Sequence, residues 1–279
     1  MTEGQVTQVQ VDDITIACQD MGSGYPLVLI NGFASTMDMW NPPVLAALRE
    51  RFRVLVFDNR GTGYSTASEK AFTIPLFAED TLSLMEALGI GKAHILGLSM
   101  GAAIALELAI SRPEKVDRLI LVAGECGGAE AVKADPEVWA RLTDKSGTPA
   151  EIAERMFSLI FPPEWLREHP DPWAYCPEVY ETTSEANAAR QIAAFKGWQG
   201  CCRKLGRITA KTLVVTGTRD VIIPPANAGM IAQGIPGARL LEIGGAGHGL
   251  MYQEPDRISR AILDFLGKAE PGYGKRGMA

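Results

Sequence analysis

Five short apolar runs without polar alternation constrain the fold of this 279-residue chain most strongly. Runs of this length, rich in Val, Ile and Leu, are typical of strands that are buried on both faces, as in a parallel sheet. Longer segments with helical periodicity separate several of them, and this alternation predicts a doubly wound α/β sheet. The runs are Pro26–Ile30, Val54–Phe57, Ala93–Leu98, Arg118–Val122 and Thr212–Thr216.

Three further strands and three helices complete the predicted core. Val6–Val11 and Ile14–Gln19 flank Asp12 and Asp13, which favours a hairpin and an antiparallel entry to the sheet. Arg239–Ile243 is predicted as the last strand. The predicted helices are Ile74–Leu88, Met100–Ile110 and Ile258–Leu266.

The interval from Gly127 to Trp198 breaks this alternation because it contains no convincing strand. We expect residues 127–198 to form a helical cap, or lid, inserted over the carboxyl edge of a core made of residues 1–126 and 199–279. The tail after Gly267 is expected to be loose. The predicted cap helices are Pro136–Leu142, Ala150–Leu159, Pro163–Glu168 and Ala186–Gly197.

Composition narrows the classes of protein and partner. Hydrophobic residues make up 47% of the chain and charged residues 22%, which excludes disordered and collagen-like chains. The net charge of −6 disfavours nucleic acid and membrane surfaces as partners. No apolar run approaches the roughly 18 residues of a membrane-spanning helix. The polar start lacks the pattern of a secretory signal, so a cytoplasmic location is expected.

The five cysteines are odd in number and none has the spacing of a metal site. We therefore expect five free thiols in a reducing compartment, no disulfide and no metal. They are Cys18, Cys126, Cys176, Cys201 and Cys202.

A G-x-S-x-G motif, Gly97–Gly101, lies between a predicted buried strand and an Ala-rich helix. In this context Ser99 occupies a sharp strand-to-helix turn that raises its hydroxyl above the sheet. Side chains at positions 97 and 101 would collide with that turn, so both positions require glycine. Ser99 is therefore the predicted nucleophile.

A serine nucleophile needs a neighbouring base, and the chain has three histidines. His248 follows the last predicted strand and has a glycine on each side, which leaves its ring room to reach Ser99. It is the predicted base. His94 lies within an apolar strand and is predicted as a hydrogen-bonded structural residue, and His169 is expected at the surface.

The base in turn needs a carboxylate that fixes its tautomer. Asp220 lies at the carboxyl end of a predicted strand, and Glu125 after the preceding strand is the alternative. The chain order Ser99, Asp220, His248 agrees with this type of triad on an α/β sheet and favours Asp220. The predicted oxyanion-hole donors are the backbone N–H groups of Met100 and Phe33.

Together these motifs resemble the α/β-hydrolase fold family, in its capped esterase-like branch, from about Val9 to Leu266. The resemblance implies a mostly parallel eight-stranded sheet with helices on both faces, a Ser-His-Asp triad and no cofactor. Asn31 departs from the family pattern, where most relatives carry His, and we expect it to alter loop hydrogen bonding. The matching pieces are Gly22–Phe33, Asp58–Ser65, Gly97–Gly101, Gly217–Asp220 and Gly247–His248.

Apolar residues of the cap and the site loops predict a pocket for a small, uncharged ester. A monomer or homodimer is expected. The candidate lining residues are Met37, Trp139, Phe157, Phe161, Trp165, Leu250 and Met251.

The favoured function is hydrolysis of small carboxylic esters through an acyl-serine intermediate. Two alternatives stay open. The same residues could hydrolyse a carbon–carbon bond in a ring-fission product, or a lactone. The chain could also be a hydrolase-like receptor that binds a small molecule and signals through its cap, although a pure binder does not need all three catalytic residue types.

Overall fold

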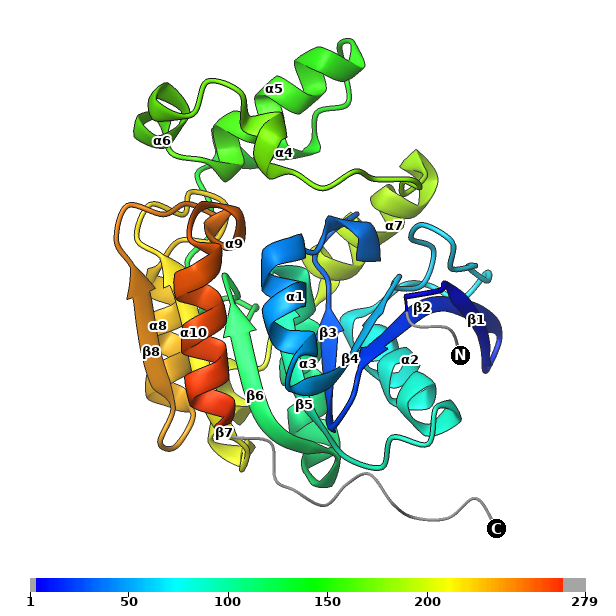
Figure 1. Ribbon diagram of the computed structural model, residues 1–279. Helices are drawn as coiled ribbons and strands as arrows, with labels where there is room; N and C mark the ends of the chain where they lie inside the picture. The colour runs from blue at the N-terminus through cyan, green and yellow to red at the C-terminus, as the bar shows by residue number, and fades with distance from the viewer. Residues whose placement is uncertain (1–3, 268–279) are drawn as a thin grey trace.

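A mostly parallel sheet of eight strands forms the centre of the computed structural model, which describes residues 4–267 (Figure 1). All eight predicted strands are present. The tail after Gly267, predicted to be loose, lies outside the described residues. The strands are β1 (Thr7–Val11), β2 (Ile14–Gly22), β3 (Tyr25–Ile30), β4 (Phe52–Phe57), β5 (Ala93–Leu98), β6 (Val116–Val122), β7 (Lys211–Gly217) and β8 (Arg239–Ile243).

The strand order is β1-β2-β4-β3-β5-β6-β7-β8. β1 pairs antiparallel with β2, and β2 antiparallel with β4, which confirms the predicted hairpin entry. All the other pairs are parallel, so β3 to β8 end at one edge of the sheet. Loops that follow these strands can therefore bring distant residues together at that edge.

Helices cover both faces of the sheet (Figure 1). The helices α1 (Pro42–Arg49) and α10 (Pro255–Leu266) contact each other on one face. On the other face, α2 (Ile74–Ala87) packs against α3 (Met100–Ser111), and α8 (Ala226–Gly234) packs against β7. The predictions for α2, α3 and α10 are confirmed, whereas α1, α8 and the short α9 (Leu250–Gln253) were not predicted.

Four helices lie between β6 and β7, and no strand does. Thr148 caps α5, because its hydroxyl accepts from the Glu151 N–H and its own N–H donates to the Glu151 carboxylate. In Figure 1, α4, α5 and α6 lie above the carboxyl edge of the sheet. The boundaries at residues 127 and 198 stay predictions. The helices are α4 (Pro136–Thr143), α5 (Pro149–Ile160), α6 (Pro163–Glu168) and α7 (Glu185–Gly197).

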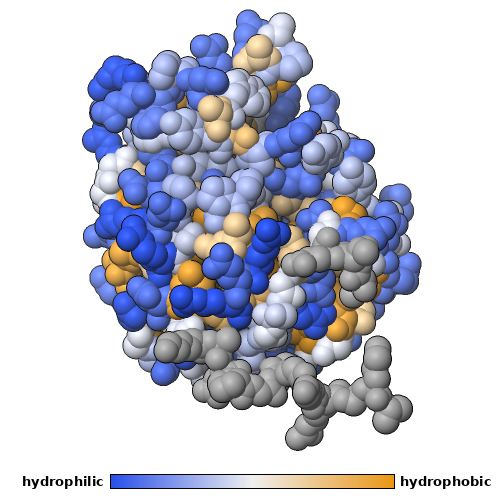
Figure 2. Space-filling view, viewed as in Figure 1, coloured by the Kyte–Doolittle hydropathy of each residue, from blue (hydrophilic) through white to orange (hydrophobic). Residues whose placement is uncertain are grey.

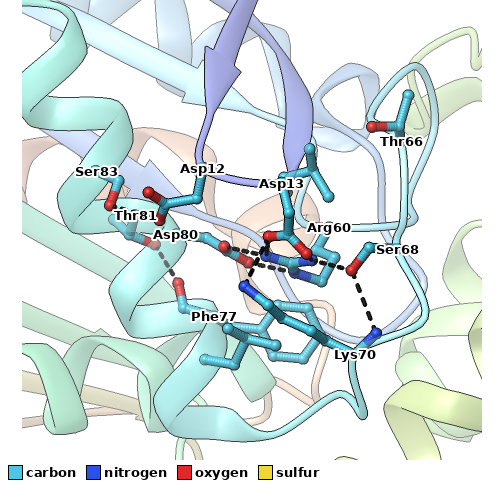
Figure 3. A network of polar contacts seen from close by, with 12 residues as sticks. Asp12, Asp13, Arg60, Thr66, Ser68, Lys70, Phe77, Asp80, Thr81 and Ser83 are labelled. Atoms are coloured by element: carbon cyan, nitrogen blue, oxygen red, sulfur yellow. Dashed lines mark hydrogen bonds and ion pairs between the residues drawn. The ribbon is translucent and has the colours of Figure 1, made fainter.

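A buried ion-pair network holds the loop after β4 against the rest of the core (Figure 3). Arg60 is 1% exposed; its guanidinium lies 2.6 Å from the Asp80 carboxylate on α2 and 3.1 Å from Asp13 in the β1–β2 turn. This guanidinium holds the pKa of the Asp13 carboxyl well below its usual range. The network fixes the base of a loop that supports the site described below.

The prediction of five free thiols is wrong, because Cys126 and Cys202 form a disulfide. They are 76 residues apart in the chain, so their spacing carries no signal. The fold brings them together where the chain leaves β6 and returns after α7, and there the Cys201 N–H donates to the Cys126 carbonyl over 2.7 Å. Cys18, Cys176 and Cys201 are free.

The face drawn in Figure 2 is mostly hydrophilic, with hydrophobic residues in scattered groups. Within residues 4–267, no helix combines the length and the apolarity needed to cross a bilayer.

Candidate active site

Ser99 lies at the sharp turn between β5 and α3. Its φ of 57° and ψ of −120° are a strained conformation for a residue with a side chain. A Cβ at Gly97 would lie 2.3 Å from the Gly101 carbonyl oxygen, and a Cβ at Gly101 would lie 2.1 Å from that of Ile30. Both glycines are therefore required by steric contact, as the motif predicts.

Ser99, His248 and Asp220 form one hydrogen-bonded chain. The His248 Nε2 lies 3.0 Å from the Ser99 Oγ, and the His248 Nδ1 lies 2.8 Å from an Asp220 carboxylate oxygen. The loops after β5, β7 and β8 supply the three side chains, all at the carboxyl edge of the sheet. In this arrangement the histidine can accept the serine proton while the carboxylate orients the ring.

Asp220 is held rigidly. Its side chain is fully buried, and its second oxygen accepts hydrogen bonds of 2.9 Å from the backbone N–H groups of Ile222 and Ile223. The carboxylate therefore cannot rotate away from the imidazole without breaking two further hydrogen bonds.

The glycines beside His248 are required by close packing rather than by backbone conformation. Neither has a positive φ, so left-handed backbone is not the reason for glycine. A Cβ at Gly247 would instead lie 2.5 Å from the Ile160 carbonyl oxygen, and a Cβ at Gly249 would lie 2.4 Å from the Ile160 side chain. The end of α5 thus packs directly on the histidine loop and fixes its path.

The two predicted oxyanion donors lie beside the nucleophile. A Cβ at Gly32 would lie 3.1 Å from the Ser99 Cβ, which shows how closely the loop after β3 approaches the serine. Within residues 4–267, the N–H groups of Phe33 and Met100 donate no hydrogen bond to another group. Both are therefore available to a bound oxyanion.

Asn31 makes two hydrogen bonds within this loop. Its side-chain oxygen accepts from the Gly32 N–H at 2.9 Å, and its amide nitrogen donates to the Thr36 carbonyl at 2.6 Å. Asn31 thus closes the loop onto itself and leaves the next N–H, that of Phe33, unoccupied.

Gln191 on α7 is a residue that the sequence analysis missed. Its side-chain oxygen accepts from the Ala34 N–H and its amide nitrogen donates to the Thr62 hydroxyl, each at 2.8 Å. Thr183 holds the Ala34 carbonyl at 3.1 Å. Ala34 has a φ of 53°, so these bonds stabilise an unfavourable backbone next to the oxyanion loop. The available signal is that Gln191 interrupts a buried alanine stripe on α7, with Ala188 and Ala194.

A cavity of about 870 Å³ opens beside Ser99. Of the seven predicted pocket residues, only Trp139 lines it, together with the predicted oxyanion residues Phe33 and Met100. The other six lie outside this cavity, because they pack into the hydrophobic core or against one another. Met37, Leu250 and Met251 belong to the core, and Phe157, Phe161 and Trp165 form an aromatic stack.

The remaining candidates from the sequence are not part of the hydrogen-bonded chain. Glu125 lines the cavity but pairs with Lys133 at 2.8 Å. His94 is buried, yet its Nδ1 makes no hydrogen bond with good geometry, and burial lowers its pKa to about 4. His169 is half-buried, and its ring stacks on Trp165.

Asp58 supports the loop after β3 from below. It is fully buried, and its carboxylate accepts from the backbone N–H groups of Met37 and Tyr64 at 2.7 and 2.9 Å. Burial raises its pKa to about 6 despite these bonds. Within the described part of the chain, no group of three or more His, Cys, Asp or Glu side chains could hold a metal ion.

Comparison with known proteins identifies the family. A family model described as "alpha/beta hydrolase fold" matches residues 25–255. An Agrobacterium fabrum protein named "Putative carbamate hydrolase RutD" is 30% identical over an alignment of 251 residues, and the match covers 86% of this chain and 92% of that protein.

Solved structures give the same result. The enol-lactonase from Burkholderia xenovorans LB400 matches with a TM-score of 0.80 and 28% identity, over 93% of this chain and 99% of that one. A thermophilic esterase from Thermogutta terrifontis matches with a TM-score of 0.79 and 27% identity, over 94% and 98%. The chain belongs to the α/β-hydrolase fold family.

Proposed function

We propose that this protein is a serine hydrolase that cleaves small carboxylic esters through an acyl-serine intermediate. The observation that carries the proposal is the Ser99–His248–Asp220 hydrogen-bonded chain, with distances of 3.0 and 2.8 Å, at the wall of the cavity. The geometry supports nucleophilic catalysis because the serine, the base and the orienting carboxylate are already within hydrogen-bond reach.

In the proposed reaction, the Ser99 oxygen attacks the ester carbonyl carbon while its proton passes to the His248 Nε2. The carbonyl oxygen becomes an oxyanion that the N–H groups of Phe33 and Met100 stabilise. The imidazolium then protonates the leaving alcohol, and the acyl group stays on the serine. Water, deprotonated by His248, attacks the acyl-serine and releases the acid, which restores the hydroxyl.

The first test is the Ser99→Ala variant with a p-nitrophenyl ester. Loss of the nucleophile is expected to lower kcat by ~1,000-fold or more, with the fold unchanged by circular dichroism. Ser83→Ala on α2 is the matched control and is expected to keep wild-type activity. A phosphonate inhibitor that labels wild type but not Ser99→Ala identifies the nucleophile by mass spectrometry. Retained turnover in Ser99→Ala would refute the proposal.

Lactone hydrolysis is the second candidate, favoured by the match to an enol-lactonase over 99% of that protein. The same residues would open the ring, with the alcohol leaving group still attached to the acyl chain. A panel of acyclic esters and lactones of equal carbon number separates the two candidates by kcat/KM. Higher kcat/KM values for the lactones would identify a lactone, rather than an acyclic ester, as the preferred substrate.

A further inference from the structure

The cavity contains one buried carboxylate that the proposed reaction does not use. Glu125 is 4% exposed and lines the same cavity as Ser99. It follows the end of β6 by three residues, after Ala123 turns the chain with a φ of 48°. Because Ser99 follows the adjacent strand β5, the carboxylate and the nucleophile lie at neighbouring positions of one sheet edge.

Only one oxygen of this carboxylate has a partner. Glu125 Oε1 accepts from the Lys133 ammonium at 2.8 Å, whereas Oε2 makes no hydrogen bond or ion pair with any other residue in the range 4–267. Lys133 is 60% exposed, so it compensates the charge of the buried carboxylate from the solvent side. Glu125 lines the cavity and Oε2 is not a fully buried atom, so a hydrogen-bond donor on a ligand in the cavity can reach it.

The backbone at Glu125 is fixed on both sides. The Ala123 N–H donates to the Val215 carbonyl of β7 at 2.8 Å. On the other side, Cys126 is tied to Cys202 by the disulfide, and the Cys201 N–H donates to the Cys126 carbonyl. Because its backbone is held in place on both sides, the Glu125 carboxylate is preorganised to bind a ligand.

We infer that Glu125 is a substrate-binding residue and that the preferred ester carries a hydrogen-bond donor, a hydroxyl or an N–H group, on its acyl chain. This inference rests on the proposed ester hydrolysis and names its substrate class. The donor binds Glu125 Oε2 while the ester carbonyl lies at Ser99. A carboxylate at the same place on the substrate is disfavoured, because it would meet a like charge. The apolar part of the wall, which includes Trp139 and Ile222, contacts the carbon chain.

The experiment compares p-nitrophenyl ω-hydroxyalkanoates of increasing chain length with the alkanoates that carry a methyl group in place of each hydroxyl. A hydrogen bond to a charged group predicts that wild type prefers the hydroxylated ester by about tenfold or more in kcat/KM, at the one chain length that spans Ser99 to Glu125. A ratio near one at every length overturns the inference, while continued dependence on Ser99 leaves the proposed function intact.

Two variants separate recognition from a merely structural ion pair. Glu125→Met removes the acceptor and is expected to bring the hydroxyl-to-methyl ratio to about one. Lys133→Met removes the ion pair but keeps the carboxylate, so the preference for the hydroxylated ester is expected to remain. If each variant instead lost the same fraction of kcat/KM on the hydroxylated ester and on the methyl ester, the Glu125–Lys133 ion pair would have only a structural role. Glu154→Met, at an exposed position on α5 outside the cavity, is the control and is expected to keep the wild-type ratio.

Discussion

At the scale of single residues, two carboxylates lie in the loops that follow two neighbouring strands, and they differ in their hydrogen-bond partners. Asp220 after β7 bonds the His248 ring and two backbone N–H groups. Glu125 after β6 bonds Lys133, and its other oxygen has no hydrogen-bond partner within residues 4–267. The chain order in the sequence favours Asp220 as the partner of the histidine, and the structure has this pairing. Because their partners differ, neutralising Asp220 and neutralising Glu125 are expected to have different effects on activity.

Asp220→Asn is expected to lower kcat by about 10⁴-fold, because the amide favours the wrong imidazole tautomer. Glu125→Gln is expected to lose far less on an alkanoate ester that has no hydrogen-bond donor. Steady-state kinetics of both variants on p-nitrophenyl butanoate give the comparison. The reverse ranking would assign the orienting carboxylate to Glu125.

His94 predicts a pH dependence of stability. Burial lowers its pKa from 6.5 to about 4, so between these values the unfolded chain binds the proton and the folded chain does not. The free energy of unfolding therefore falls as the pH drops from 6.5 to 4, by on the order of 3 kcal/mol. Asp58, with its pKa raised to about 6, acts in the opposite direction over much of this window.

Comparison of wild type with His94→Phe isolates the histidine, because the Asp58 contribution cancels between the two proteins. Phenylalanine keeps the ring contacts with Tyr25 and Phe52. Urea unfolding at several pH values is expected to give a shallower loss of stability below pH 6.5 in the variant. Parallel curves for the two proteins would contradict the lowered pKa.

At the scale of elements, α7 connects the segment between β6 and β7 to the oxyanion loop through Gln191. Gln191→Met keeps the length of the side chain but removes both hydrogen bonds. We expect kcat to fall about tenfold to a hundredfold with little change in KM, since the Phe33 N–H is needed most in the transition state. Affinity for a boronic acid transition-state analogue is expected to fall in proportion.

Asn187→Ala is the matched control for that experiment. Asn187 also lies on α7 and bonds the core, at the Gly61 carbonyl, whereas the Ala34 N–H donates to Gln191. An equal loss of kcat in both variants would mean that α7 acts only through general packing.

Some helices and strands can be predicted from the sequence, and others cannot. The central strands are apolar on both faces, so β3 to β7 are evident from composition alone, and the strand before Ser99 makes its motif specific. The helix α8 contains two glycines, which weaken its helical signal. The aromatic residues near α5 and α6 are apolar in any arrangement, and only the three-dimensional structure separates those that pack together from Trp139 at the cavity. The two residues that Gln191 bonds are 157 and 129 positions away in the chain, so no local sequence pattern predicts these contacts.

At the scale of the whole molecule, the disulfide closes a loop of 76 residues. The chain-entropy relation predicts that it stabilises the folded state by about 4.5 kcal/mol. Reduction is therefore expected to lower the denaturant midpoint of wild type and of Cys176→Ser, whose free thiol is not involved. Cys202→Ser is expected to unfold at the same midpoint with and without reductant. Identical wild-type curves in both conditions would contradict this contribution.

The Cys126–Cys202 disulfide also marks where the segment between β6 and β7 could be exchanged. The Cα atoms of Cys126 and Cys202 are 5.1 Å apart, so the chain between β6 and β7 departs from and rejoins the core at one point. Insertions and domain grafts succeed best where the two junctions are adjacent in space. We therefore expect that replacing the segment between these cysteines with that of a relative changes ligand preference, measured as kcat/KM on an ester panel, while the strands keep their register.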